Sequence, residues 1–275
     1  MRDKTFAANI RLAIPRLTEN HATLRAALST GQVHASQPSH YAVEPLTDTQ
    51  LRSLYDQQLA HPSGAARPIY DELLAGARYN LCTYCQHAQA TTLDHFLPKS
   101  WVAGLAIEPW NLVPACQQCN KKLSSFHAAG ESDTLFHPYE EQVTERWLFA
   151  ELVEGEPPVL RFVANPPESL DALSRDRVCS QFATLGLAFM FSAISGRDIA
   201  EARLSVAQSV RVAREMGSAA EVVVSPTSVS ESLLETSRMA FAVDVNSRRG
   251  AAYEALGMSV SFCNELAHAA EGRGG

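Results

Sequence analysis

The stretch that decides the fold runs from Cys82 to Leu123 and reads CTYCQHAQATTLDHFLPKSWVAGLAIEPWNLVPACQQCNKKL. It holds two C-x-x-C pairs, made by Cys82, Cys85, Cys116 and Cys119. Each pair can place two thiolates on one side of a tight turn, and two pairs complete the tetrahedral sulfur site that Zn²⁺ prefers. Four cysteine ligands leave no open coordination position, so we expect a structural zinc. Two unrelated turns with free thiols, or a redox pair, are the alternatives.

The segment that these pairs enclose and the residues just after it carry a chemically distinctive set of side chains. The set comprises one carboxylate, one imidazole, two carboxamides and three ammonium groups: Asp94, His95, Asn111, Asn120, Lys99, Lys121 and Lys122. A neutral imidazole can take a proton from water near pH 7. Carboxylate and carboxamide oxygens are hard ligands suited to Mg²⁺ or Mn²⁺, and lysines can hold phosphates. The set is sufficient for hydrolysis of a phosphodiester bond.

The order of these residues resembles that of a known family. The pattern C-x-Y-C, L-D-H-F-x-P-K-S and N-L-V-P-A-C-x-x-C-N-x-x-L, over about residues 80–125, is similar to the HNH endonuclease family in its zinc-containing form. This resemblance implies an α+β fold with a ββα-metal core, in which two strands, a loop and one helix surround a divalent ion. Helices at the N- and C-terminal sides would flank the core.

The resemblance also implies a role for each residue that matches the motif. Asp94 would bind the catalytic Mg²⁺ or Mn²⁺, and His95 would be the general base. Asn111 would hydrogen-bond near His95 and orient its ring. Asn120 stands where the family often has histidine, and its carboxamide oxygen would be a metal ligand. The alternatives are structural: a strand-end or turn residue for Asp94 and Asn111, and a helix-end hydrogen bond for Asn120.

The lysines and the strand geometry complete these expectations. Lys99, Lys121 and Lys122 would contact phosphates, although lysines more often form a solvated face. Neighbouring side chains on a regular strand point to opposite faces, so Asp94 and His95 can face one phosphate only where the strand ends, twists or bulges.

Charge and composition limit the possible partners. The 275 residues include 23 basic and 30 acidic side chains, for a formal net charge of −7. A protein that coats nucleic acid or a membrane with its whole surface is therefore excluded, and any contact with DNA must be local. We find no secretory leader and no apolar stretch long enough to span a bilayer, which favours a cytoplasmic protein without a membrane partner.

The chain divides by pattern into three parts. Residues 1–79 read as an N-terminal helical segment, and residues 80–164 as the nuclease core followed by a β-hairpin. The hairpin strands are expected at 147–153 and 159–163. Residues 165–275 form a helical region, with helices expected at 171–194, 198–216, 230–245 and 249–270 and an irregular segment at 217–230.

These patterns predict a metal-dependent endonuclease that cuts DNA, with zinc for structure and Mg²⁺ or Mn²⁺ for catalysis. The alternative is a non-catalytic zinc module for nucleic-acid or protein interaction, in which Asp94 and His95 are structural. The layout, with flanking helices and the stretch Phe136–Tyr139, also resembles HNH proteins of bacterial anti-phage systems such as the Septu type. This second resemblance implies an antiviral role and an ATPase subunit as partner.

Overall fold

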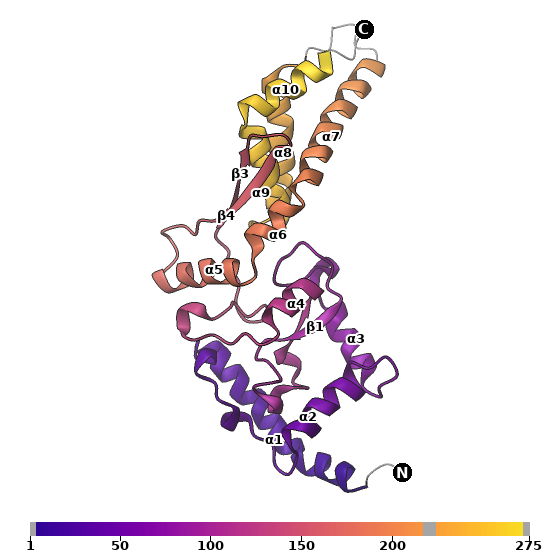
Figure 1. Cartoon of the computed structure of the whole chain (residues 1–275), viewed down its shortest axis with the longest axis vertical. Coiled ribbons are helices and arrows are strands. Elements are labelled where there is room, and N and C mark those ends of the chain that lie inside the picture. The colour runs from indigo at the N-terminus through magenta and orange to yellow at the C-terminus, as the bar shows by residue number, and fades with distance from the viewer. Residues whose placement is uncertain (1–3, 217–223, 272–275) are drawn as a thin grey trace. The chain divides into compact units, whose positions relative to one another are not determined.

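A computed structural model describes residues 4–216 and 224–271 (Figure 1). The chain forms two compact units. The first comprises Met1–Gln142 and Ala172–Leu185, and the second comprises Val143–Asp171 and Gly186–Gly275. Within the described residues, no helix is long and apolar enough to cross a membrane.

The expected ββα core lies in the first unit. Strand β1 (Thr92–His95) pairs antiparallel with β2 (Leu112–Ala115), so that Thr92 faces Ala115 and His95 faces Leu112. Helix α4 (Gln117–Leu123) begins directly after β2, with Cys116 as its N-cap. All four β2 residues are buried, as is typical of a strand enclosed on both faces. The α+β fold class is confirmed.

The connection between β1 and β2 is compact because one side chain closes it. It contains the short 3₁₀ turns η5 (Ala103–Leu105) and η6 (Pro109–Asn111). The Asn111 Oδ1 accepts from the Leu97 backbone N–H at 2.7 Å, and its Nδ2 donates to the carbonyls of Leu97 at 2.9 Å and Leu105 at 3.2 Å. Asn111 is fully buried, so these bonds hold both sides of the loop together.

The N-terminal helices pack directly on this core. Helix α1 (Lys4–Ser29) continues through Pro15 as one element. Helix α2 (Asp48–Leu54) is capped by Thr47, whose side chain accepts from the Gln50 N–H. A π-helical turn, η3 (Tyr55–Leu59), follows it, and α3 (Arg67–Ala75) comes next. Further 3₁₀ turns are η1 (Val33–Ala35), η2 (Pro38–Tyr41), η4 (Arg78–Asn80) and η7 (Glu131–Asp133).

Two shared hydrophobic clusters explain why the N-terminal segment belongs to the same unit as the motif. In the first, Leu24 and Leu28 of α1 pack with Leu97, Val102 and Leu105 of the connection. In the second, Tyr55, Leu59 and Tyr70 pack with Leu93 and Leu112 of the two strands. The helices of residues 1–79 therefore support the sheet that carries Asp94 and His95.

Helix α5 (Ala172–Thr184) also belongs to the first unit, although it follows the hairpin in sequence. Its buried Arg177 donates to both carboxylate oxygens of Glu141, at 2.6 and 2.9 Å, and to the carbonyls of Thr134 and Leu135. The Gln181 side chain accepts from the backbone N–H of Phe136 at 2.8 Å. A buried guanidinium with four acceptors fixes the helix to this segment.

The second unit combines the hairpin with helices. Strand β3 (Leu148–Val153) pairs antiparallel with β4 (Val159–Ala164). Its described residues also form the helices α6 (Leu187–Ala193), α7 (Ser195–Glu215), α8 (Pro226–Val243), α9 (Arg248–Met258) and α10 (Val260–Glu271). The hairpin forms at the expected residues but packs on α9, so it lies in this unit and not with the nuclease core. Arg248 and the buried Asp198 form an ion pair at 2.5 Å that joins α9 to α7.

Two expected helices are each divided. The expected helix at 171–194 breaks at Gly186, whose φ of +62° is the left-handed conformation that glycine adopts readily. The expected helix at 249–270 breaks at Ser259, whose extended backbone ends α9. Of the irregular segment expected at 217–230, residues 217–223 lie outside the described residues, and residues 226–230 begin α8.

Replacing Arg177 tests how α5 is attached. The Arg177→Met variant removes the guanidinium from the Glu141 carboxylate and from two carbonyls, and leaves the carboxylate only the His137 N–H as donor. We therefore expect the first unit to lose about 3 kcal/mol of unfolding free energy. Urea denaturation followed by circular dichroism measures this change. The Arg175→Met variant, on the same helix, is the control. Equal stability of the two variants would contradict the anchoring role.

Candidate active site and metal centre

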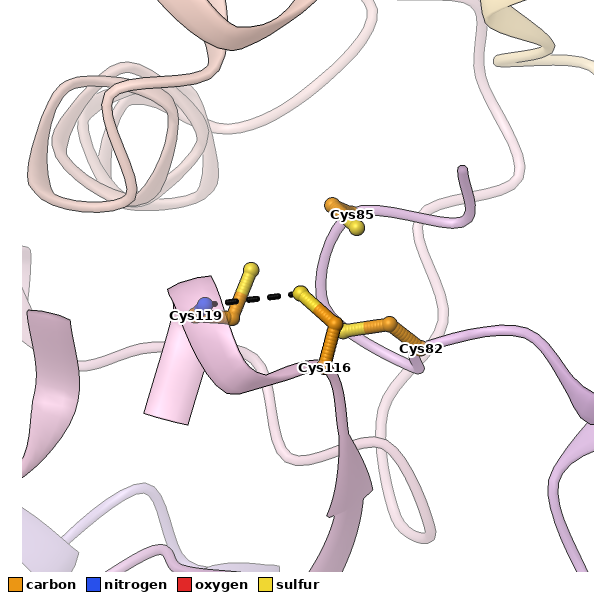
Figure 2. A group of neighbouring side chains, drawn as sticks. All are labelled: Cys82, Cys85, Cys116 and Cys119. Atoms are coloured by element: carbon orange, nitrogen blue, oxygen red, sulfur yellow. Dashed lines mark hydrogen bonds between the residues drawn. The ribbon is translucent and has the colours of Figure 1, made fainter. Parts of the chain in front are cut away.

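The four cysteines converge as the sequence predicts. Their sulfur atoms all lie within 4.8 Å of one another, and all four residues are buried (Figure 2). Cys82 and Cys85 come from the turn before β1, whereas Cys116 and Cys119 come from the end of β2 and the first turn of α4. Sulfur atoms bound to one zinc lie about 3.8 Å apart. The donor set and its spacing therefore fit a Zn²⁺ ion.

Hydrogen bonds already organise the two thiols at α4. The Cys119 N–H donates to the Cys116 Sγ at 3.4 Å, the dashed contact in Figure 2. A hydrogen bond between the two thiols lowers the pKa of Cys116 and raises that of Cys119. The helix N-terminus favours negative charge at Cys116, which is the form that binds metal.

The first cysteine pair is joined to the sheet through the two residues between its cysteines. The Thr83 N–H and hydroxyl both donate to the Pro114 carbonyl of β2, at 3.1 and 2.9 Å. The Tyr84 hydroxyl donates to the Asp94 Oδ2 at 2.9 Å. The same turn therefore supplies zinc ligands and positions the carboxylate of β1. Tyr84 belongs to the quoted motif, but its role was not predicted from the sequence.

Asp94 is a buried carboxyl with little to balance its charge. It is 3% exposed. Burial raises its pKa to about 7, although the hydrogen bond from Tyr84 lowers it. A nearby cation favours the charged form of such a group. Asp94 is therefore suited to bind a divalent metal ion.

His95 is held as a neutral imidazole. Its Nε2 lies 2.9 Å from the Ala106 carbonyl, which can only accept a hydrogen bond, so the proton resides on Nε2 and Nδ1 keeps its lone pair. The Tyr55 ring packs edge-on at 4.4 Å between centroids. Burial, together with the Lys99 ammonium, lowers the pKa of His95 to about 4, although the hydrogen bond to the Ala106 carbonyl raises it. At neutral pH the ring is therefore neutral.

Asn111 does not orient the His95 ring directly. Its three hydrogen bonds go to the backbone of Leu97 and Leu105. The Ala106 carbonyl, which lies in the loop that Asn111 closes, makes the hydrogen bond to the ring. The sequence could not show this partner, because a backbone carbonyl leaves no mark in a side-chain pattern.

Asn120 lies against the strand face that carries Asp94. Its Nδ2 donates to the Thr92 hydroxyl at 3.2 Å, which leaves the Oδ1 to act as a ligand. Thr92 and Asp94 alternate onto one face of β1, and His95 falls on the other. The His95 backbone N–H donates to the Asp94 carboxylate. Among the described contacts, no hydrogen bond joins the side chains of any two of Asp94, His95 and Asn120. Strand β1 ends at His95, which is the position where a strand end, twist or bulge was expected.

The three lysines have different environments. Lys121 and Lys122 are exposed on α4. Lys99 forms an ion pair with Asp56 and lies over the Tyr55 ring, with its Nζ 4.4 Å from the centroid. Tyr55 and Asp56 begin the π-helical turn, about 40 residues before the Asp94–His95 pair. Neither residue was predicted from the sequence, where the only available signal is their place after a well-capped helix.

The cysteine cluster predicts dependence on zinc. The Cys82→Ser and Cys116→Ser variants should lose bound zinc and unfold the segment between the pairs, because the ligands hold both of its ends. Elemental analysis together with circular dichroism measures both effects. Cys179→Ser, which changes an exposed cysteine of α5, is the control. A Cys116→Ser variant that folds normally without zinc would contradict the structural role.

Asn111 predicts a loss of stability that is separate from catalysis. The Asn111→Ala variant removes three buried hydrogen bonds and leaves the Leu97 N–H and carbonyl without the partner that Asn111 supplies, so we expect it to cost about 3 kcal/mol in unfolding free energy. Gln118→Ala, which removes an exposed carboxamide from α4, serves as the control in the same urea titration. An Asn111→Ala variant as stable as this control would show that the loop does not depend on these bonds.

Comparisons with known proteins agree with this geometry. The model of the family described as HNH endonuclease matches residues 82–126. The chain is 28% identical to Protein ea31 of Escherichia phage lambda over 217 residues, which cover 75% of this chain and 73% of that relative. No solved structure matches. Neither match supports the resemblance to a Septu-type subunit. Residues 82–126 form an HNH domain with the two-stranded sheet of β1 and β2, helix α4 and four cysteines that could bind zinc.

Proposed function

We propose that this protein is a divalent-metal-dependent endonuclease that hydrolyses phosphodiester bonds in DNA. The observation that supports this most strongly is His95, a buried neutral imidazole whose Nε2 is fixed by the Ala106 carbonyl inside an HNH domain. That arrangement leaves Nδ1 as a proton acceptor at neutral pH. A general base of this kind is needed to activate water.

Each of these side chains has a separate role in the proposed reaction. His95 takes a proton from the attacking water through Nδ1. Asp94 and the Asn120 Oδ1 would hold Mg²⁺ or Mn²⁺. Both are hard oxygen donors, and Asn120 of α4 lies against the face of β1 that carries Asp94. When bound, the ion stabilises the charge that develops on the phosphate and on the leaving 3′ oxygen. Tyr84 orients the Asp94 carboxylate by its hydrogen bond.

Exposed lysines of the domain would make the local contact with DNA. Lys121 and Lys122 project from α4 into solvent, on the helix that carries Asn120. They would hold phosphates next to the cleaved bond as point charges. Because the whole chain is acidic, local basic groups such as these would supply the contact with DNA.

The non-catalytic zinc module is the second candidate. The bonds of Asp94 to Tyr84 and of Asn120 to Thr92 favour it, because both are contacts that a purely structural residue would make. The neutral His95 favours the enzyme, since a structural module does not require a free Nδ1. Neither the contacts nor the comparisons support the antiviral role, the ATPase partner or the cytoplasmic location.

Plasmid cleavage separates the two candidates. With Mg²⁺ or Mn²⁺, the wild-type protein should nick or linearise supercoiled DNA, and His95→Ala should be slower by about 100-fold or more, because it lacks the general base. His61→Ala, which removes an exposed histidine, should match the wild type. Equal rates for His95→Ala and wild type would exclude His95 as the base. No cleavage by the wild type with either metal would favour the non-catalytic module.

A further inference from the structure

In the free protein, the Lys99 ammonium already contacts a carboxylate and an aromatic ring. Its ammonium pairs with the Asp56 carboxylate and rests on the Tyr55 ring, 4.4 Å from the centroid. That ring also contacts His95 edge-on, with 4.4 Å between the ring centroids. The Lys99 ammonium and the imidazole that we assign as general base therefore share contact with one aromatic ring. Lys99 also lies only four residues after His95 in the chain.

The carboxylate that holds Lys99 comes from outside the HNH domain. Asp56 lies in the π-helical turn at the end of α2, 43 residues before Lys99. The Ala60 N–H donates to the Tyr55 carbonyl at 2.8 Å, which is the wider hydrogen-bonded turn of a π-helix. Such turns are rare and are frequent at functional sites. The Tyr55 hydroxyl donates to the Leu93 carbonyl of β1 at 3.2 Å, which fixes the turn beside the sheet.

The exposed fractions of Asp56 and Lys99 show that an anion from solvent can compete for the ion pair between them. The Asp56 side chain is 55% exposed and the Lys99 side chain is 28% exposed. Lys99 is thus partly shielded by Tyr55, whereas its carboxylate partner faces solvent. An incoming anion can approach from the Asp56 side, and a phosphate offers the same charge and the same acceptor oxygens as the carboxylate.

We propose that Lys99 binds a backbone phosphate of the substrate and that Asp56 occupies this phosphate position in the free protein, so that Asp56 sets the affinity for DNA. This inference rests on the proposed function and adds a residue outside the family match. Binding of substrate exchanges one anion for another at Lys99, and the Asp56 carboxylate returns to solvent. Asp56 thereby opposes the binding of any DNA whose phosphate contacts with the protein are too few or too weak to displace the carboxylate.

The test measures the binding of a fluorescently labelled DNA duplex by anisotropy, without added Mg²⁺ or Mn²⁺ so that the DNA stays intact. Asp56→Asn should bind about twofold to fivefold more tightly than wild type, as expected from loss of a partly exposed ion pair. Lys99→Ala should bind more weakly, and its dependence of log affinity on log salt should be shallower by about 0.9.

Two controls distinguish competition from a general effect of charge. Glu19→Gln removes a carboxylate that is 65% exposed and paired with Arg16, so it makes the same change in net charge. It should bind like the wild type. In the Lys99→Ala background, Asp56→Asn should give no gain beyond that of Glu19→Gln, because the two residues act through one contact.

Each outcome is decisive. Weaker binding by Asp56→Asn would mean that Asp56 positions Lys99 for substrate, and would overturn the proposal. An equal gain with and without Lys99 would reduce the effect to charge repulsion and would also overturn it. In both cases DNA binding by the wild type leaves the proposed function intact. Failure of the wild type to bind or cleave DNA would instead reject the proposed function itself.

Discussion

The convergence of four thiols is the constraint on which the rest of the HNH domain depends. Cys82, Cys85, Cys116 and Cys119 bring both ends of a 38-residue segment into one buried cluster. The strands of this segment are only four residues long, and so short a hairpin is not stable on its own in water. A metal bound by this cluster contributes the free energy that a large core would otherwise supply.

The same cluster is linked to the chemistry through a short series of contacts. Thr83 and Tyr84, between the first two cysteines, hydrogen-bond to the Pro114 carbonyl and to Asp94. Cys116 caps the helix that carries Asn120. On the other face of β1, Tyr55 and the loop closed by Asn111 enclose His95. The carboxylate thus depends on the metal cluster, whereas the imidazole depends on the N-terminal helices and the loop.

Much of this arrangement could be predicted from local sequence, because cysteine spacing and the Asp-His pair are local features. The ββα order and the hairpin at 147–163 follow from motif and alternation. Contacts between distant segments could not be predicted in the same way. Asp56 meets Lys99 only after the chain folds, and the Ala106 carbonyl that holds His95 has no side-chain signature. Helical periodicity likewise passes through Gly186, where a left-handed backbone ends the helix.

Anomalous diffraction from crystals soaked in Mn²⁺ tests the central claim most directly, because it locates each metal by element. The account predicts a zinc signal between the four cysteine sulfurs and a manganese signal beside the Asp94 carboxylate and the Asn120 Oδ1. Zinc at the cysteines with manganese only on surface carboxylates would contradict the account. The domain would then be a zinc-stabilised scaffold without a catalytic metal site.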